Sequence, residues 1–171
     1  MEQQRYRQGQ RRHIKDFRFI PLLGTCALTI AEGATLAGSS ASALKNSSVT
    51  INGTLKPTVT DDTALGKIVF SNQNVNISST GTLCLNISKA SASSTSTRGD
   101  NIKDINTLTI NGTISLKFVD YSPNIGDEIR LWTGVKSFSG TPTIECKDNV
   151  TFDASRLAEG VLVVTPADTN G

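Results

Sequence analysis

The chain has 171 residues and a formal net charge of +2, with 37% hydrophobic but only 5% aromatic residues. This length allows about one domain with a sizeable core, and the composition requires that core to be built from Leu, Ile, Val and Ala. Positive charge is concentrated in residues 1–19, which hold six of the 17 Arg and Lys residues. The rest of the chain is slightly acidic, which excludes the basic surface of a nucleic-acid-binding protein.

The N-terminal region allows two interpretations. A basic start followed by an apolar run of about 13 residues is typical of a secretory signal, and small residues at 39–43 would suit cleavage. The run is too short and too interrupted to predict a stable membrane span. However, residues 28–36 also match the repeat described next. We therefore favour residues 1–24 as a basic leader, disordered or part of a signal.

A short pattern recurs along the chain. It consists of alternating apolar and polar residues, a break that contains Gly, then Thr and a further apolar residue, and its copies lie at 28–36, 49–55, 75–85 and 108–116. Alternation is the period of a half-buried β-strand, and we expect the breaks to use residues that reach positive φ at low cost. Each copy therefore predicts two short strands on either side of a corner.

The spacing of the repeat glycines predicts an all-β fold. Gly33, Gly53, Gly81 and Gly112 are 20, 28 and 31 residues apart, a period typical of stacked solenoids. We therefore predict a short right-handed parallel β-helix (β-solenoid) over residues 25–118. The alternative is an antiparallel β-sandwich, because Asn-Gly between alternating residues is also the strongest short hairpin signal. The very short arms at 49–55 favour the solenoid.

The remaining segments differ in texture from the repeats. Residues 89–104 form the longest predicted loop, with order restarting within 101–106. From Val119 onward, short alternating strands are separated by Gly and Pro, and the last of them is apolar on both faces. We predict that residues 119–165 form a C-terminal β-rich cap, which a solenoid needs to close its open end. Residues 166–171 are then a tail.

Two C-terminal stretches carry a family resemblance. They read Gly-Asp-Glu-Ile-Arg-Leu-Trp at 126–132 and Phe-Asp-Ala-Ser-Arg-Leu-Ala-Glu-Gly-Val-Leu-Val-Val at 152–164. Both resemble the segment that closes autotransporter-associated β-strand repeat regions in bacterial surface proteins, and the upstream repeat is similar to their β-solenoid passengers. The resemblance covers about residues 28–165. It implies export, an outer membrane-associated or secreted location, and a stalk or display role without catalytic residues.

The chemistry-bearing residues do not form a recognisable site. The sole histidine, His13, lies in the basic leader, so a Ser/His arrangement in the body is excluded. Cys26, Cys84 and Cys146 are too far apart in sequence to form a metal-ligand pair. The carboxylates that a carbohydrate-active enzyme would need are scattered: Asp61, Asp62, Asp100, Asp104, Asp127, Glu128, Asp148 and Asp153. We predict no catalytic, cofactor-binding or metal-binding residues.

Two short motifs have structural explanations. Arg98-Gly99-Asp100 matches an integrin-type tripeptide in the predicted loop, but a three-residue match arises easily by chance. Six Asn-x-Ser/Thr sequences occur, at Asn46, Asn52, Asn76, Asn86, Asn111 and Asn149. Two of them coincide with the Asn-Gly breaks of the repeat, so we attribute them to the corners.

The sequence predicts a non-catalytic secreted or cell-surface β-solenoid module with a structural, display or adhesive role. Its expected partners are host or matrix proteins or glycans, and we expect a monomer or part of a longer chain. The alternative is a carbohydrate-active or carbohydrate-binding β-helix protein, which a clustered acidic groove would favour. Outward-facing ladders of Thr and Asn could bind glycans through shallow polar contacts.

Overall fold

The computed structural model describes residues 27–39, 48–58, 65–90, 98–148 and 150–166. The predicted leader (1–24) and most of the predicted tail lie outside these residues. Within the described part the protein is all-β, as predicted. Its elements are β1 (Leu28–Ile30), β2 (Thr35–Ala37), β3 (Val49–Ile51), β4 (Thr54–Lys56), β5 (Lys67–Ile77), β6 (Thr82–Ile87), β7 (Asn101–Ile110), β8 (Thr113–Phe118), β9 (Glu128–Arg130), β10 (Trp132–Ser139), β11 (Thr143–Cys146), β12 (Thr151–Asp153), the 3-10 helix η1 (Leu157–Glu159) and β13 (Val161–Thr165).

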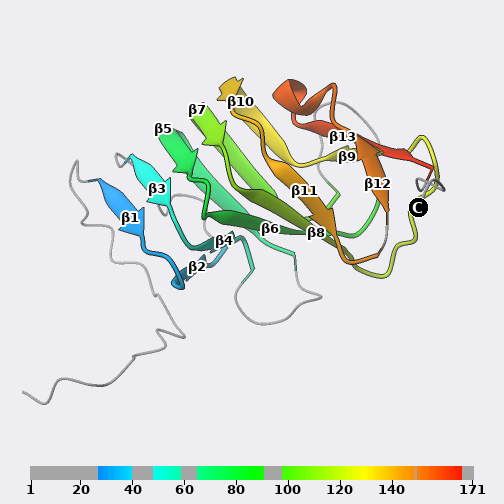
Figure 1. Ribbon diagram of the computed structural model, residues 1–171, viewed down its shortest axis with the longest axis horizontal. Coiled ribbons are helices and arrows are strands. Elements are labelled where there is room, and N and C mark those ends of the chain that lie inside the picture. The colour runs from blue at the N-terminus through cyan, green and yellow to red at the C-terminus, as the bar shows by residue number, and fades with distance from the viewer. Residues whose placement is uncertain (1–26, 40–47, 59–64, 91–97, 149, 167–171) are drawn as a thin grey trace, which may run out of the picture.

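Two five-stranded parallel sheets form the body of the protein (Figure 1). Sheet A has the order β1-β3-β5-β7-β10, and sheet B has the order β11-β8-β6-β4-β2. The chain alternates between the sheets, so that each strand of sheet A is followed by a strand of sheet B. We call each such pair a unit: β1/β2, β3/β4, β5/β6, β7/β8 and β10/β11.

The hairpin alternative is wrong. The strands on either side of Asn52-Gly53 lie in different sheets, and each pairs in parallel with the unit before and the unit after it. The same holds for the strands around Asn111-Gly112. The two parallel sheets also extend past Phe118, because β10 and β11 join them from within the block expected to form the cap.

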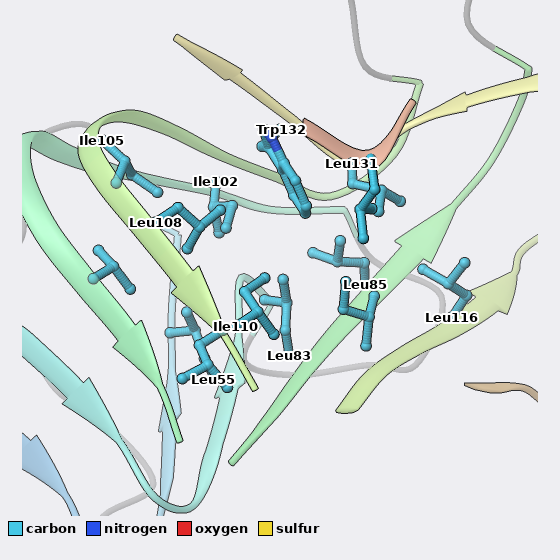
Figure 2. Close-up of a cluster of buried hydrophobic side chains, with 14 of the residues drawn as sticks. Leu55, Leu83, Leu85, Ile102, Ile105, Leu108, Ile110, Leu116, Leu131 and Trp132 are labelled. Carbon is cyan, nitrogen blue, oxygen red and sulfur yellow. The ribbon is translucent and has the colours of Figure 1, made fainter. Parts of the chain in front are cut away.

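The core consists of columns of apolar side chains in matching register. In sheet A, Ile30, Ile51, Ile77 and Ile110 are aligned, and in sheet B the aligned residues are Leu36, Leu55, Leu83, Ile114 and Ile144. Figure 2 shows side chains from both sheets, such as Leu83 and Ile110, pointing toward one another between the sheets. All members inside the stack are fully buried, whereas Ile30, Leu36 and Ile144 at its edges are half-buried.

The glycines at the three inner corners are required by close packing and not by positive φ. A Cβ on Gly81 would lie 2.2 Å from the Ile51 carbonyl oxygen, and one on Gly112 would lie 2.1 Å from the Gly81 carbonyl oxygen. Gly53 has an equally close neighbour in the preceding unit. Of the four repeat glycines only Gly33 has a positive φ, of 75°. Our expectation about φ was therefore wrong for the three inner corners.

The long strands of sheet A bend at matched positions. Ser71 and Asn72 in β5, Asp104 in β7 and Gly134 in β10 all have φ between 51° and 65°. The register of β5 against β7 shifts at the same place. The first part of each strand therefore runs at an angle to the second, and it adds Ile68, Ile102 and Trp132 to the core.

A third, antiparallel sheet lies at the C-terminal end of the stack. It has the order β12-β13-β9, and Figure 1 shows it at the opposite end of the molecule from β1. Trp132 is 1% exposed. Its ring stacks on Phe138 with ring centroids 5.3 Å apart, and it lies directly under Gly160, which follows η1. The segment of η1 and Gly160, which leads into β13 of this sheet, therefore covers part of the last unit.

Candidate functional site

The carboxylates lie apart, and most are engaged by their own local contacts. Asp127 accepts hydrogen bonds from the Tyr121 hydroxyl and from the Asn124 backbone N–H, and these bonds lower the pKa of Asp127. Asp153 accepts from Ser155, which lowers the pKa of Asp153. Asp148 accepts from the Phe118 N–H.

Among the described residues, Asp127, Asp148 and Asp153 are each held by a separate set of donors, which differs from the paired acid and base of a hydrolase. Glu128 forms an ion pair with Arg156, which also pairs with Glu159. In the described part of the chain, no three His, Cys, Asp or Glu residues gather in a group that could hold a metal ion. Asp61, Asp62 and His13 lie outside the described residues. The acidic groove that would favour a carbohydrate-active enzyme is not formed by the carboxylates that the structure places.

Asp100 has a structural position that the sequence did not indicate. Its side chain is fully buried. One carboxylate oxygen accepts from the Gly66 N–H at 2.6 Å, and the other accepts from the Asn86 N–H at 2.8 Å. Burial raises the pKa of Asp100, while these two bonds act in the opposite direction. Asp100 thus joins the start of β5, the end of β6 and the start of β7.

The burial of Asp100 removes the adhesive interpretation of Arg98-Gly99-Asp100. An integrin-type motif needs an accessible Asp carboxylate, and this one is 0% exposed and occupied by two backbone donors. The Arg98 carbonyl oxygen also accepts from the Ser88 and Lys89 N–H groups. The backbone of the tripeptide is therefore hydrogen-bonded to the residues at the end of β6 and directly after it.

The outer face of sheet A carries small neutral polar side chains. One register column consists of Thr29, Thr50, Asn76, Thr109 and Ser139. Beside it lies a second column of Asn74, Thr107 and Ser137. All eight side chains are exposed or half-exposed, and none is charged. We call these eight residues the sheet A polar face.

Some of these side chains hold one another in place. The Thr109 and Ser139 hydroxyls are 2.9 Å apart, and the Asn106 amide donates to the Asn74 side-chain oxygen at 2.9 Å. Because neighbouring strands lie about 4.8 Å apart, the column presents donors and acceptors at a regular interval. Such a surface can form many shallow hydrogen bonds with a neutral polar polymer.

The outer face of sheet B differs in charge. It carries a column of five threonines, namely Thr35, Thr54, Thr82, Thr113 and Thr143. The next outward column includes Cys84, Ser115 and Glu145. Two lysines lie nearby, Lys56 at the end of β4 and Lys117 two residues after Ser115 on β8. Alternation along β6 is expected to place Cys84 on the opposite face from Leu83 and Leu85. The structure confirms this, because Cys84 is half-exposed and both leucines are buried.

The other features singled out in the sequence are spread over the structure. Asn76 and Asn111 are exposed, whereas Asn86 is 5% exposed and cannot carry a glycan. Asn46 and Asn149 lie outside the described residues, as does Cys26. Burial raises the pKa of the Cys146 thiol, which makes the thiol less reactive.

A shallow depression of about 280 Å³ is lined by residues that include Ser39, Leu65 and Lys67. Its described lining contains the Lys67 amine but no carboxylate that could act with it.

Comparison with known proteins gives no family for this chain: no protein-family model, curated protein or solved structure matches it. The described residues also include no helix with the length and apolarity needed to cross a membrane. Because no matching protein points to a site, the sheet A polar face is singled out by its geometry alone. Sequence alternation pointed to outward Thr and Asn, but the register that aligns them came only from the structure.

Proposed function

We propose that this protein is a non-catalytic β-solenoid module, a right-handed parallel β-helix that serves as a structural, display or adhesive element at a cell surface or in secreted form. The observation that carries this proposal is the alignment of all five units. The same apolar columns and the same corner contacts are repeated from unit to unit. A fold of this kind gives a rigid, polar-faced body whose length depends on the number of units.

The distribution of carboxylates supports a role without catalysis. Asp100, Asp127 and Asp148 each accept hydrogen bonds from backbone N–H groups in separate parts of the molecule. These residues stabilise turns and strand ends. The resemblance to bacterial surface repeats supports the proposed location, which is tested separately below.

Removal of one complete turn tests the solenoid. Deleting residues 82–112 joins Gly81 to Thr113, so that Gly81 takes the place of the equivalent Gly112 directly before β8. In a solenoid the remaining units can stack again, so we expect cooperative thermal unfolding by circular dichroism. The matched control deletes only residues 82–98, which removes β6 and joins a corner directly to the start of β7. If the smaller deletion is tolerated better than the larger one, the solenoid is contradicted.

Protease treatment of intact cells tests the proposed location. The full chain would carry an epitope after residue 171 in the cells that produce it. We expect the epitope in the medium or on the surface, where external protease removes it without cell lysis. An epitope that remains inside and protected contradicts a display or adhesive role.

Carbohydrate binding is the second candidate function, favoured by the uncharged hydroxyl and amide groups of the sheet A polar face. We propose that this face binds neutral polysaccharides through many weak hydrogen bonds. Retention of the purified protein on insoluble neutral polysaccharides tests this idea. We expect Thr109→Lys to reduce retention and Ser115→Lys, on the outer face of sheet B, to leave it unchanged. Equal effects of the two substitutions would exclude the sheet A polar face as the binding surface.

A further inference from the structure

The sequence Asn-Gly occurs at two inner corners, and the structure places the two copies in different surroundings. Asn52-Gly53 lies between β3 and β4, and Asn111-Gly112 lies between β7 and β8. An Asn followed by Gly is chemically susceptible, because Gly has no side chain to hinder attack by its backbone nitrogen. The surroundings of that nitrogen therefore determine how readily each copy reacts.

The backbone nitrogen of the first copy is engaged. The Gly53 N–H donates to the Ile30 carbonyl oxygen at 3.2 Å, and the Asn52 N–H donates to the same oxygen at 2.8 Å. In addition, the Asn52 side chain is half-buried. Reaction at this corner requires that the Gly53 hydrogen bond break first.

The second copy lacks this restraint. The Asn111 N–H donates to the Ile77 carbonyl oxygen at 2.9 Å, but the Gly112 N–H has no acceptor among the described residues. The Asn111 side chain is exposed. Its carboxamide is thus open to water, and the backbone nitrogen that would attack it has no hydrogen bond to break within the described part of the chain.

We propose that Asn111-Gly112 is a site of spontaneous deamidation in the folded protein, and that the Gly53 hydrogen bond protects Asn52-Gly53 from the same reaction. The Gly112 backbone nitrogen attacks Cγ of Asn111 and loses its proton, and the Asn111 side-chain nitrogen leaves as ammonia. The resulting five-membered succinimide is opened by one water molecule at either carbonyl. The products at this position are aspartate in a normal linkage and isoaspartate, whose main chain is longer by one methylene.

The isoaspartate product would not fit this corner. A Cβ on Gly112 would already lie 2.1 Å from the Gly81 carbonyl oxygen and 2.3 Å from the Ser78 carbonyl oxygen. The extra methylene lies in the main chain of residue 111, so it displaces the neighbouring Gly112, which has no free space toward the preceding unit. The corner must therefore move away from that unit. That movement strains the bond from the Thr113 N–H to the Gly81 oxygen and the bond from the Thr143 N–H to the Gly112 oxygen. Isoaspartate at position 111 therefore loosens the last two units.

Ageing of the full chain in native buffer tests the proposal. Samples incubated at mildly alkaline pH would be digested, and isoaspartate plus aspartate would be quantified by mass spectrometry in the peptides that contain each Asn-Gly. We expect about threefold to tenfold more product at Asn111 than at Asn52, as the loss of one net backbone hydrogen bond predicts. The third Asn-Gly, Asn170-Gly171, lies outside the described residues, and its peptide must be resolved from the others.

The same incubation in guanidinium chloride is the matched control. Unfolding frees both glycine nitrogens, so the two sites should then react at similar rates. Equal rates at Asn52 and Asn111 in native buffer, faster reaction at Asn52, or a native Asn111 that does not react would each overturn the proposal.

A substitution separates the effect of charge from the effect of chain length. Asn111→Asp adds the charge without the methylene, and we expect its melting temperature to stay close to that of the fresh protein. Protein enriched in isoaspartate at position 111 should melt at a lower temperature. If the aged protein melts like Asn111→Asp, the proposed loosening of the corner is wrong.

Discussion

Asp100 joins three segments of the chain through one buried carboxylate. Its two oxygens accept from Gly66 and Asn86, which lie 34 and 14 residues away in the sequence. A polar group in such a position is stabilising only while its hydrogen bonds are intact, because a buried unpaired donor costs about 1–3 kcal/mol. No motif in the sequence distinguishes Asp100 from the exposed carboxylates, since its role depends on distant backbone groups.

Replacing Asp100 tests this role directly. Asp100→Ala leaves two buried N–H groups without an acceptor, and we expect a loss of about 1–3 kcal/mol in the free energy of unfolding at neutral pH. Urea denaturation measures the difference. Glu145→Ala, which removes an exposed carboxylate on β11, is the control and should change stability by less than about 0.5 kcal/mol. Equal losses would contradict the proposed joining role of Asp100.

The contribution of Asp100 to the free energy of unfolding should decrease as pH rises. Burial raises the pKa of Asp100 above its ordinary value of 3.8, so the folded state binds the proton more tightly than the unfolded state. The stability contributed by this proton is then complete below pH 3.8 and declines as pH rises through the raised pKa. We expect the difference between wild type and Asp100→Ala in urea unfolding to shrink from acid toward neutral pH. A difference that grows over that range contradicts the raised pKa.

The corners show how one residue type serves two purposes in different units. Gly112 is needed because the Gly81 carbonyl oxygen occupies the direction of its missing Cβ, whereas Gly33 has open space there but a positive φ. Sequence alone does not separate these cases, because both corners contain Gly before an apolar strand. The separation depends on how closely the preceding unit approaches.

Alanine substitutions at these two corners measure the difference. Gly112→Ala must push apart two units, and we expect it to lower the free energy of unfolding by more than about 2 kcal/mol. Gly33→Ala carries only the cost of a left-handed conformation, about 1–2 kcal/mol. Thermal unfolding of the two variants under one set of conditions gives the order. The opposite order would contradict close packing as the reason for glycine at the inner corners.

Sequence alternation was sufficient to place the strands around each Asn-Gly break. The pairs at 49–55 and 108–116 and the inward direction of Ile51 and Ile110 follow from period-two patterning, and the structure confirms them. The bends in β5 and β7 were missed because they occur at Ser71, Asn72 and Asp104, and positive φ is uncommon for residues other than glycine.

The fifth unit was also missed. Its corner reads Gly140-Thr141-Pro142 between β10 and β11, which lacks the Asn-Gly-Thr of the inner copies. Its inward residues, Phe138 and Ile144, continue the columns of Leu108 and Ile114. Only strand register reveals this continuity, because Gly and Pro interrupt the alternation.

The whole molecule is a stack in which position along the sheets decides how much each apolar residue contributes. Ile30 and Ile110 occupy the same column, but Ile30 lies at the edge and is half-buried, whereas Ile110 is 0% exposed. Burying an unpaired carboxylate is far more costly than leaving it near solvent. Equivalent substitutions should therefore have unequal effects along the column.

Aspartate substitutions along this column test the stack. We expect Ile110→Asp, and likewise Ile51→Asp, to abolish cooperative unfolding or lower stability by several kcal/mol. Ile30→Asp should cost much less, because its side chain can turn toward water. Circular dichroism melting curves of the variants provide the comparison. A melting transition that Ile51→Asp and Ile110→Asp leave unchanged contradicts the stacked core.

The placement of β1 and the third sheet at opposite ends of the stack has a mechanical consequence (Figure 1). A pulling force applied between these ends acts across the strands and along their hydrogen bonds, so it loads one strand pair at a time. The protein should therefore peel apart in small successive steps at low force instead of rupturing in a single event. Each unit that unfolds lengthens the chain between the two ends while the remaining units stay folded. Under tension the molecule would therefore extend gradually and dissipate the applied force.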